Sequence, residues 1–64
     1  MKRAVTRGTR FWDEPNARWI TTDAISTPGI WYCIVEEFTE DLDIITSRAF
    51  FPENELIKMV RCDV

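Results

Sequence analysis

Five acidic side chains lie close together in the middle of the chain and are its most conspicuous candidates for chemistry. They are Glu36, Glu37, Glu40, Asp41 and Asp43. Carboxylate oxygens are the ligands that Ca²⁺ and Mg²⁺ prefer, and the Asp41-x-Asp43 spacing would suit a cation site. The stretch lacks the glycine and the closing glutamate of an EF-hand loop. Because solvated acids are typical of a hairpin tip, we predict no metal site; a weak cation site and a docking surface for a basic partner remain the alternatives.

Catalysis by a nucleophile or a general acid–base pair usually requires a histidine, or paired acids in a cleft. The chain has no histidine, which excludes a triad of the Ser-His-Asp type. Its cysteines, Cys33 and Cys62, have no evident base beside them, and we expect two reduced thiols. We therefore predict no enzyme activity, no catalytic residue and no cofactor. Free thiols without a secretory signal or a membrane-length apolar run predict a cytoplasmic protein that does not enter a membrane.

Basic and aromatic side chains are interleaved in the first third of the chain. Residues 1–18 carry a net charge of +3 and residues 19–64 a net charge of −6, which gives −3 overall. Small barrels bind single strands by stacking bases on aromatic rings while arginines follow the phosphates. The candidate phosphate contacts are Arg3, Arg7, Arg10 and Arg18. Since the acidic remainder of the chain would repel phosphate, nucleic-acid binding is the alternative function and not the preferred one.

Large aromatic side chains are more numerous than the core of a 64-residue chain can enclose. We expect at least one of Trp12, Trp31 and Tyr32 to be partly exposed, where it would anchor a protein partner or a second copy. The expected partner-binding residues are Trp12, Trp31, Tyr32, Glu37, Glu40 and Asp41. We also expect a homodimer, in which two copies bury Trp12 or Trp31 across a symmetric interface.

Turn-forming residues recur at short intervals and separate stretches rich in Thr, Ile, Val, Phe and Trp, a pattern typical of short strands. The predicted strands are residues 9–12, 18–25, 30–38 and 44–51. Thr27-Pro28-Gly29 is the tightest predicted turn, and residues 39–43 form an acidic hairpin tip. The predicted core residues are Phe11, Trp19, Ile34, Phe50 and Leu56, joined either by Cys33 and Val35 or by Tyr32.

The tail after Phe51 fits two structures. Pro52 followed by acids suits the first turn of a longer helix. A short helical turn at 52–56 and a closing strand from Ile57 to Cys62 fit slightly better. The predicted fold class is therefore all-β, or β-rich α+β: a small curved antiparallel meander or barrel of four or five strands. It forms a single domain over residues 1–64 with a basic N-terminal arm at 1–8.

This layout resembles the Src-homology-3-like (SH3-like) small barrels. Phe51-Pro52-Glu53-Asn54-Glu55-Leu56 is similar to the Phe-Pro-x-Asn-Tyr-Val segment before the last strand of the eukaryotic domains. Gly8-Thr9-Arg10-Phe11 is similar to the first strand of bacterial and phage members. Glu55 replaces a tyrosine of the polyproline groove, so binding of proline-rich ligands is not implied. Trp31-Tyr32-Cys33 also resembles part of the plasmid-borne type II dihydrofolate reductases, at the level of fold only.

The sequence thus favours a non-enzymatic protein-interaction or regulatory module. The module would dock a partner through exposed aromatics and the acidic hairpin, as a small accessory protein of a phage or mobile element could. The alternative is a small barrel that binds nucleic acid with the basic N-terminal third.

Overall fold

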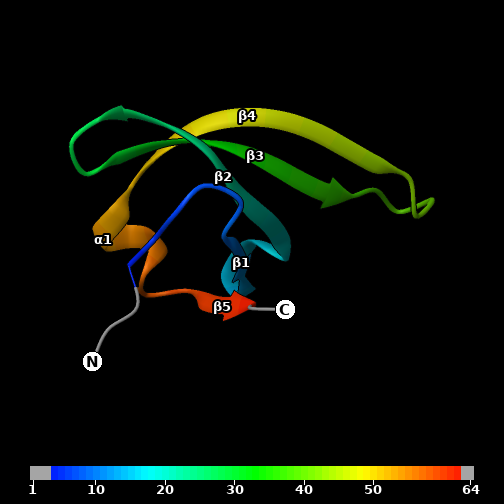
Figure 1. Ribbon diagram of the computed structural model, residues 1–64. Helices are drawn as coiled ribbons and strands as arrows, with labels where there is room; N and C mark the ends of the chain where they lie inside the picture. Colours follow the sequence, from blue (N-terminus) through cyan, green and yellow to red (C-terminus); the bar gives the residue numbers. More distant parts are fainter. Residues whose placement is uncertain (1–3, 63–64) are drawn as a thin grey trace.

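The computed structural model describes residues 4–62, which form a strand-rich fold (Figure 1). Its elements are β1 (Arg10–Asp13), a 3-10 turn η1 (Glu14–Asn16), β2 (Arg18–Thr27), β3 (Ile30–Phe38), β4 (Ile44–Pro52), α1 (Glu53–Leu56) and β5 (Val60–Cys62). The bounds of β3 agree with the predicted ones. The predicted all-β class is confirmed.

The five strands make one antiparallel sheet in the order β4-β3-β2-β1-β5. Strand β2 connects the β1–β5 side of the sheet to the β3–β4 side. Its first residues pair with β1, while its whole length pairs with β3. Irregular register between Thr22 and Ala24, and again between Ile25 and Thr27, bends β2 and curls the sheet (Figure 1). Within residues 4–62 no pairing joins β4 to β5, so the curled sheet stays open.

One face of the sheet holds the core, because alternate residues of each strand point toward it. The buried apolar residues are Val5, Phe11, Ile20, Trp31, Cys33, Val35 and Leu56. Leu56 reaches this cluster from α1, and Val5 reaches it from the segment before β1. The part of the predicted N-terminal arm that the structure describes is therefore packed on the body of the domain.

The predicted core is only partly correct. Phe11 and Leu56 are buried as predicted, and the alternative with Cys33 and Val35 is the right one for the third strand. Trp19 and Ile34 are half-buried, because their strands turn these residues to the opposite face of the sheet. Phe50 lies on that face as well and is 60% exposed. The strands were placed correctly, but the face that each residue takes was misjudged.

The segment after β4 is a single helical turn followed by a short strand, as the preferred prediction had it. Pro52 precedes α1, and the acids Glu53 and Glu55 lie in its first turn, where the helix dipole favours negative charge. The Glu53 amide donates to the Gly29 carbonyl at 2.8 Å, which fixes α1 beside the β2–β3 turn. Within residues 4–62, no helix combines the length and the apolar character needed to span a membrane.

Candidate functional site

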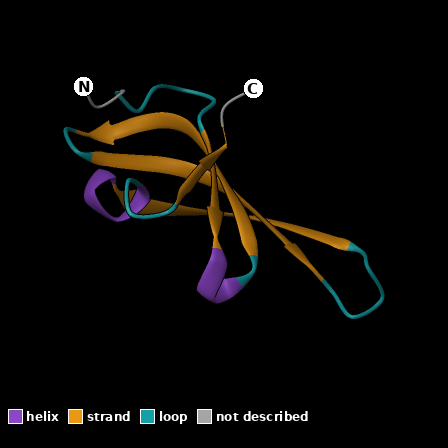
Figure 2. Ribbon diagram, turned by 90° about the horizontal axis from the view of Figure 1, so that it is seen from below, coloured by secondary structure: helices purple, strands orange, loops and turns teal. Residues whose placement is uncertain are grey.

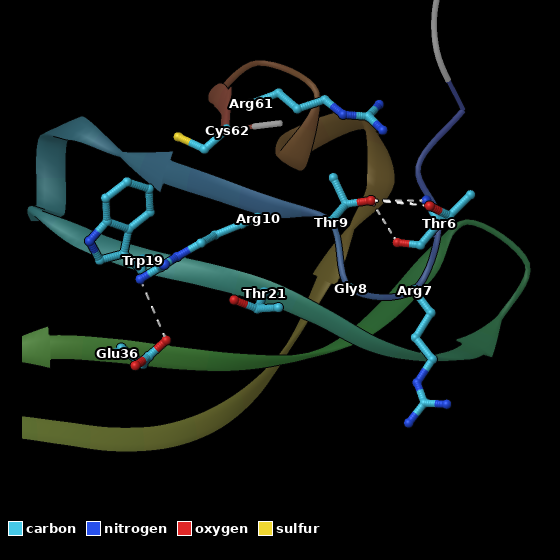
Figure 3. Close-up of a pocket in the computed structure, with 10 residues that line it drawn as sticks. All are labelled: Thr6, Arg7, Gly8, Thr9, Arg10, Trp19, Thr21, Glu36, Arg61 and Cys62. Carbon is cyan, nitrogen blue, oxygen red and sulfur yellow. Dashed lines mark hydrogen bonds and ion pairs between the residues drawn. The ribbon is translucent and has the colours of Figure 1, made fainter. Parts of the chain in front are cut away.

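A groove of about 650 Å³ lies on the outer face of the sheet, opposite the core (Figure 3). Its walls are the loop before β1, the strands β1, β2 and β3, and the end of β5. The lining residues are Thr6, Arg7, Gly8, Thr9, Arg10, Trp19, Thr21, Glu36, Arg61 and Cys62. Of the basic and aromatic residues predicted as a nucleic-acid surface, Arg7, Arg10 and Trp19 lie in this lining, together with the acidic Glu36.

Arg10 is held in this groove by two contacts within the chain. Its guanidinium lies 4.2 Å from the centre of the Trp19 ring and 3.9 Å from a carboxylate oxygen of Glu36 (Figure 3). Both contacts are attractive, since a ring face and a carboxylate each favour a positive charge. Much of the charge that Arg10 would offer to a phosphate is therefore already compensated within the chain.

The loop before β1 is held in place by threonines. The Thr22 hydroxyl donates to the Thr6 carbonyl at 2.6 Å and accepts a bond from the Thr9 amide at 2.9 Å. The Gly8 amide donates to the Thr22 carbonyl at 2.8 Å, with Gly8 at a φ of 85°. This network fixes the backbone at one end of the groove. Arg7 extends from it into solvent, 3.8 Å from Asp23.

The four arginines predicted to follow phosphates do not form one surface. Arg7 and Arg10 line the groove. Arg18 instead lies on the core face of the sheet, with its guanidinium 5.5 Å from the centre of the Phe51 ring. Arg3 lies outside the described residues. Strand alternation explains the separation, because Arg18 shares the face of Ile20 and not that of Trp19.

Arg18 instead completes a buried polar site with Asp13. The Arg18 Nε donates to Asp13 Oδ2 at 2.7 Å, and the Asn16 side-chain amide donates to the same oxygen at 2.9 Å. Burial by itself would raise the pKa of Asp13, but these two hydrogen bonds and the Arg18 charge outweigh it and hold the pKa below its ordinary value. This site fixes the turn between β1 and β2 and is structural.

The predicted aromatic anchors lie in different environments. Trp12 is half-buried and packs on Trp19, with ring centres 4.8 Å apart, and its indole N–H donates to Glu14. Tyr32 is half-buried against Phe50, at 5.0 Å. Partial exposure of at least one of the three aromatics is thus confirmed.

Trp31 is 4% exposed, so its expected place on a docking surface is wrong. Its side chain points to the core face between its neighbours in β2 and β4, and its indole N–H donates to Glu53 at 3.1 Å. A dimer that buries Trp31 is excluded for the same reason, because the ring is already covered within one copy.

A second candidate surface is the projecting hairpin, defined here as residues 37–46 of β3, β4 and their connection. Both views show it extending away from the rest of the molecule (Figures 1 and 2). Strand β2 pairs with β3 only as far as Glu37, so the hairpin beyond that residue has no third strand beside it. Its side chains are consequently solvated on both faces.

Large apolar side chains on this hairpin are exposed to solvent. They are Phe38, Leu42, Ile44 and Ile45, each more than half exposed. Phe38 and Ile44 face each other across the two strands, and Leu42 at the tip is 80% exposed. Exposed apolar side chains that lie together are candidate interaction sites, and the cross-strand pair of Phe38 and Ile44 meets this description.

Leu42 also has an unusual backbone. Its φ is 65°, in the left-handed region that disfavours a leucine, and its amide donates to the Thr39 carbonyl at 3.0 Å. The turn is closed further by the Thr39 amide, which donates to the Asp43 carbonyl at 2.8 Å. Residues in sparsely populated backbone regions are enriched at functional sites, which makes the exposed Leu42 a candidate contact residue.

The predicted acidic contacts surround this apolar tip. Glu37, Glu40 and Asp41 are all exposed. Glu37 lies 3.9 Å from Arg18, whereas the ion pairs found within residues 4–62 do not include Glu40 or Asp41. In the described part of the chain no group of three or more His, Cys, Asp or Glu side chains is arranged to hold a metal ion.

Sequence reasoning identified the acids of the hairpin but missed its apolar residues. Phe38 and the Ile44-Ile45 pair were placed in the predicted strands 30–38 and 44–51, and Leu42 in the acidic tip at 39–43, but none of them was predicted to be a contact residue. The missing information was the length by which β3 and β4 extend past β2. No protein-family model matches this chain, and comparisons with curated proteins and with solved structures give no match either.

Proposed function

We propose that this protein is a non-enzymatic interaction module that docks a protein partner through its projecting hairpin. The observation that carries the proposal is the set of exposed apolar side chains on the hairpin, with Leu42 held at its tip in a left-handed backbone conformation. The acids beside the cluster define the partner's chemistry. The complementary surface is an apolar pocket with basic side chains around its rim, since interfaces combine an apolar centre with a polar rim.

The fold supports this type of role. The strand order and the helical turn before the last strand are the layout of SH3-like barrels, and we propose that the chain is an open variant of that fold. Both cysteines are free, which suits a protein of the cytoplasm. A role as an accessory protein of a phage or mobile element is compatible with this size and fold.

Affinity capture with matched variants tests the docking proposal. The full chain is immobilised and exposed to a lysate of the cells that encode it. Phe38→Ser and Leu42→Gly each alter the projecting hairpin. Ile57→Ser is the control, because Ile57, after α1, is 50% exposed and thus comparable with Phe38 at 54%. We expect one protein that binds the parent and Ile57→Ser stoichiometrically and is lost from both hairpin variants. Retention by both hairpin variants would contradict the proposal.

A second candidate is single-stranded nucleic-acid binding, which the groove favours because Arg7, Arg10 and Arg61 line it together with Trp19. The ion pairs of Arg7 with Asp23 and of Arg10 with Glu36 weaken this candidate. Fluorescence anisotropy with a labelled oligonucleotide separates the two functions. Binding that weakens steeply between low and physiological salt, and that Arg10→Gln weakens further, would favour the nucleic-acid function.

A further inference from the structure

The outer edge of β4 is the one long uncovered edge among the described strands. Strand β4 ends the sheet on one side with nine residues, whereas β5 ends it on the other with three (Figure 1). Short strands are one way in which proteins protect their edges, and β5 has that protection. Strand β4 carries no lysine, and its proline lies at its last position. The edge is therefore open to another strand.

The hydrogen bonds at the ends of β4 show which backbone groups face this edge. The Asp43 carbonyl accepts from Thr39, and the Glu53 amide donates to Gly29, so both residues point toward β3. The pairing of β3 with β4 runs without a register shift between them. Because successive residues of a strand point their N–H and C=O groups to opposite sides, Ile44, Thr46, Arg48 and Phe50 point theirs to the open edge.

Among antiparallel pairings of β4 with itself, one engages all four of these residues with each other. An antiparallel pair centred on Ser47 places Thr46 opposite the partner's Arg48, and Ile44 opposite the partner's Phe50. Every outward amide from Ile44 to Phe50 then has a carbonyl acceptor across the interface. A pair centred on Arg48 would set two arginines directly opposite each other and would place Ile44 against Pro52, which has no N–H to donate.

The side chains suit the same register. Ile44 and Phe50 are both more than half exposed in the single chain, and each would cover the other's apolar surface. The serines at the centre are small and leave the backbones free to approach. No like charges lie directly opposite each other in this pairing.

We propose that two copies of this chain associate through their β4 edges, centred on Ser47, to form one continuous sheet. This pairing does not rest on the proposed docking function, since it uses backbone groups at the β4 edge. It covers Ile44 of the projecting hairpin but leaves Leu42, at the tip, outside the paired residues. An edge contact of this length lies at the small end of specific interfaces, so the dimer is concentration-dependent.

Cysteine crosslinking tests the register, in a Cys62→Ser background that keeps only the buried Cys33. Ser47 occupies a position where the two Cα atoms lie about 4.5 Å apart, within the range of a disulfide. We expect Ser47→Cys to crosslink to itself under mild oxidation. Thr46→Cys alone crosslinks poorly, but a mixture of Thr46→Cys and Arg48→Cys crosslinks well. Equal crosslinking of Ser47→Cys and Thr46→Cys, or none, would overturn the proposal.

A charge swap tests the association without oxidation. Thr46→Lys faces the partner's Arg48 but also the chain's own Glu36, so it weakens the dimer while favouring the fold. Thr46→Glu has the opposite effects. Sedimentation equilibrium should show a dimer dissociation constant raised roughly 2- to 30-fold by the lysine and lowered by the glutamate, because two equivalent pairs change. The pairing is refuted if the two variants shift the dimer dissociation constant in the same direction or leave it unchanged. It is also refuted if the parent protein stays monomeric at millimolar concentration.

Discussion

Leu42→Gly is expected to stabilise the protein and to abolish partner binding at the same time. A leucine in the left-handed region costs about 1–2 kcal/mol, and glycine removes this cost. Glycine also makes the unfolded chain more flexible, which lowers the free energy of unfolding by about 0.5–1 kcal/mol. The leucine side chain is 80% exposed at a φ of 65°, so its removal forfeits little buried surface. The net gain is about 0.5–1 kcal/mol, which corresponds to a melting temperature about 2–8 °C higher for a domain of this size.

Thermal unfolding followed by tryptophan fluorescence measures this gain. Asp41→Gly is the matched control, because its backbone does not lie in the positive-φ region and the same change should destabilise the protein by about 0.5–1 kcal/mol. A melting temperature for Leu42→Gly that falls as far as that of Asp41→Gly would refute the reasoning. In that case Leu42 would contribute to folding and its exposure would not indicate a docking role.

Three other predictions concern the fold. Asp13→Asn should destabilise the protein by about 1.5–3 kcal/mol in urea unfolding at pH 7, because Asp13 is buried and accepts from Arg18 and Asn16. Since the pKa of Asp13 is lowered by folding, this difference should persist down to about pH 4 and close only as the pH falls through the lowered pKa. Leu56→Ala should lower the free energy of unfolding by about 2–5 kcal/mol, because Leu56 is buried. Ile57→Ala should lower it by only about 0.5 kcal/mol, because Ile57 is exposed; equal losses would contradict the placement of α1. Burial raises the pKa of the Cys33 thiol to about 11, so mass spectrometry after alkylation at pH 8 should show label on Cys62 only.

The strands were predictable because local signals define them. Thr27-Pro28-Gly29 marks the turn between β2 and β3, and Gly29 does adopt a positive φ of 83°. Residues 30–38 are rich in β-branched and aromatic side chains, and β3 covers the same range. The end of α1 and the start of β5 were harder to place. Apolar and polar side chains in residues 57–62 alternate too weakly to favour either the period of a helix or that of a strand.

The orientation of the strands was not predictable to the same degree. Trp31 and Tyr32 are adjacent aromatics, and only the pairing with β2 and β4 decides that Trp31 faces the core. A shift of one residue exchanges the faces of a strand, so the error for Phe50 and Ile34 follows from the same ambiguity. The projecting hairpin depends on the relative lengths of β2, β3 and β4, which no local pattern encodes.

Hydrogen–deuterium exchange on the protein with and without its captured partner tests the docking claim most directly. Exchange reports which backbone amides become protected when the complex forms. We predict slower exchange confined to the projecting hairpin, residues 37–46, and little change around the groove. Protection centred on residues 6–10 and 19–21, with the hairpin unchanged, would contradict the claim and transfer the binding function to the groove.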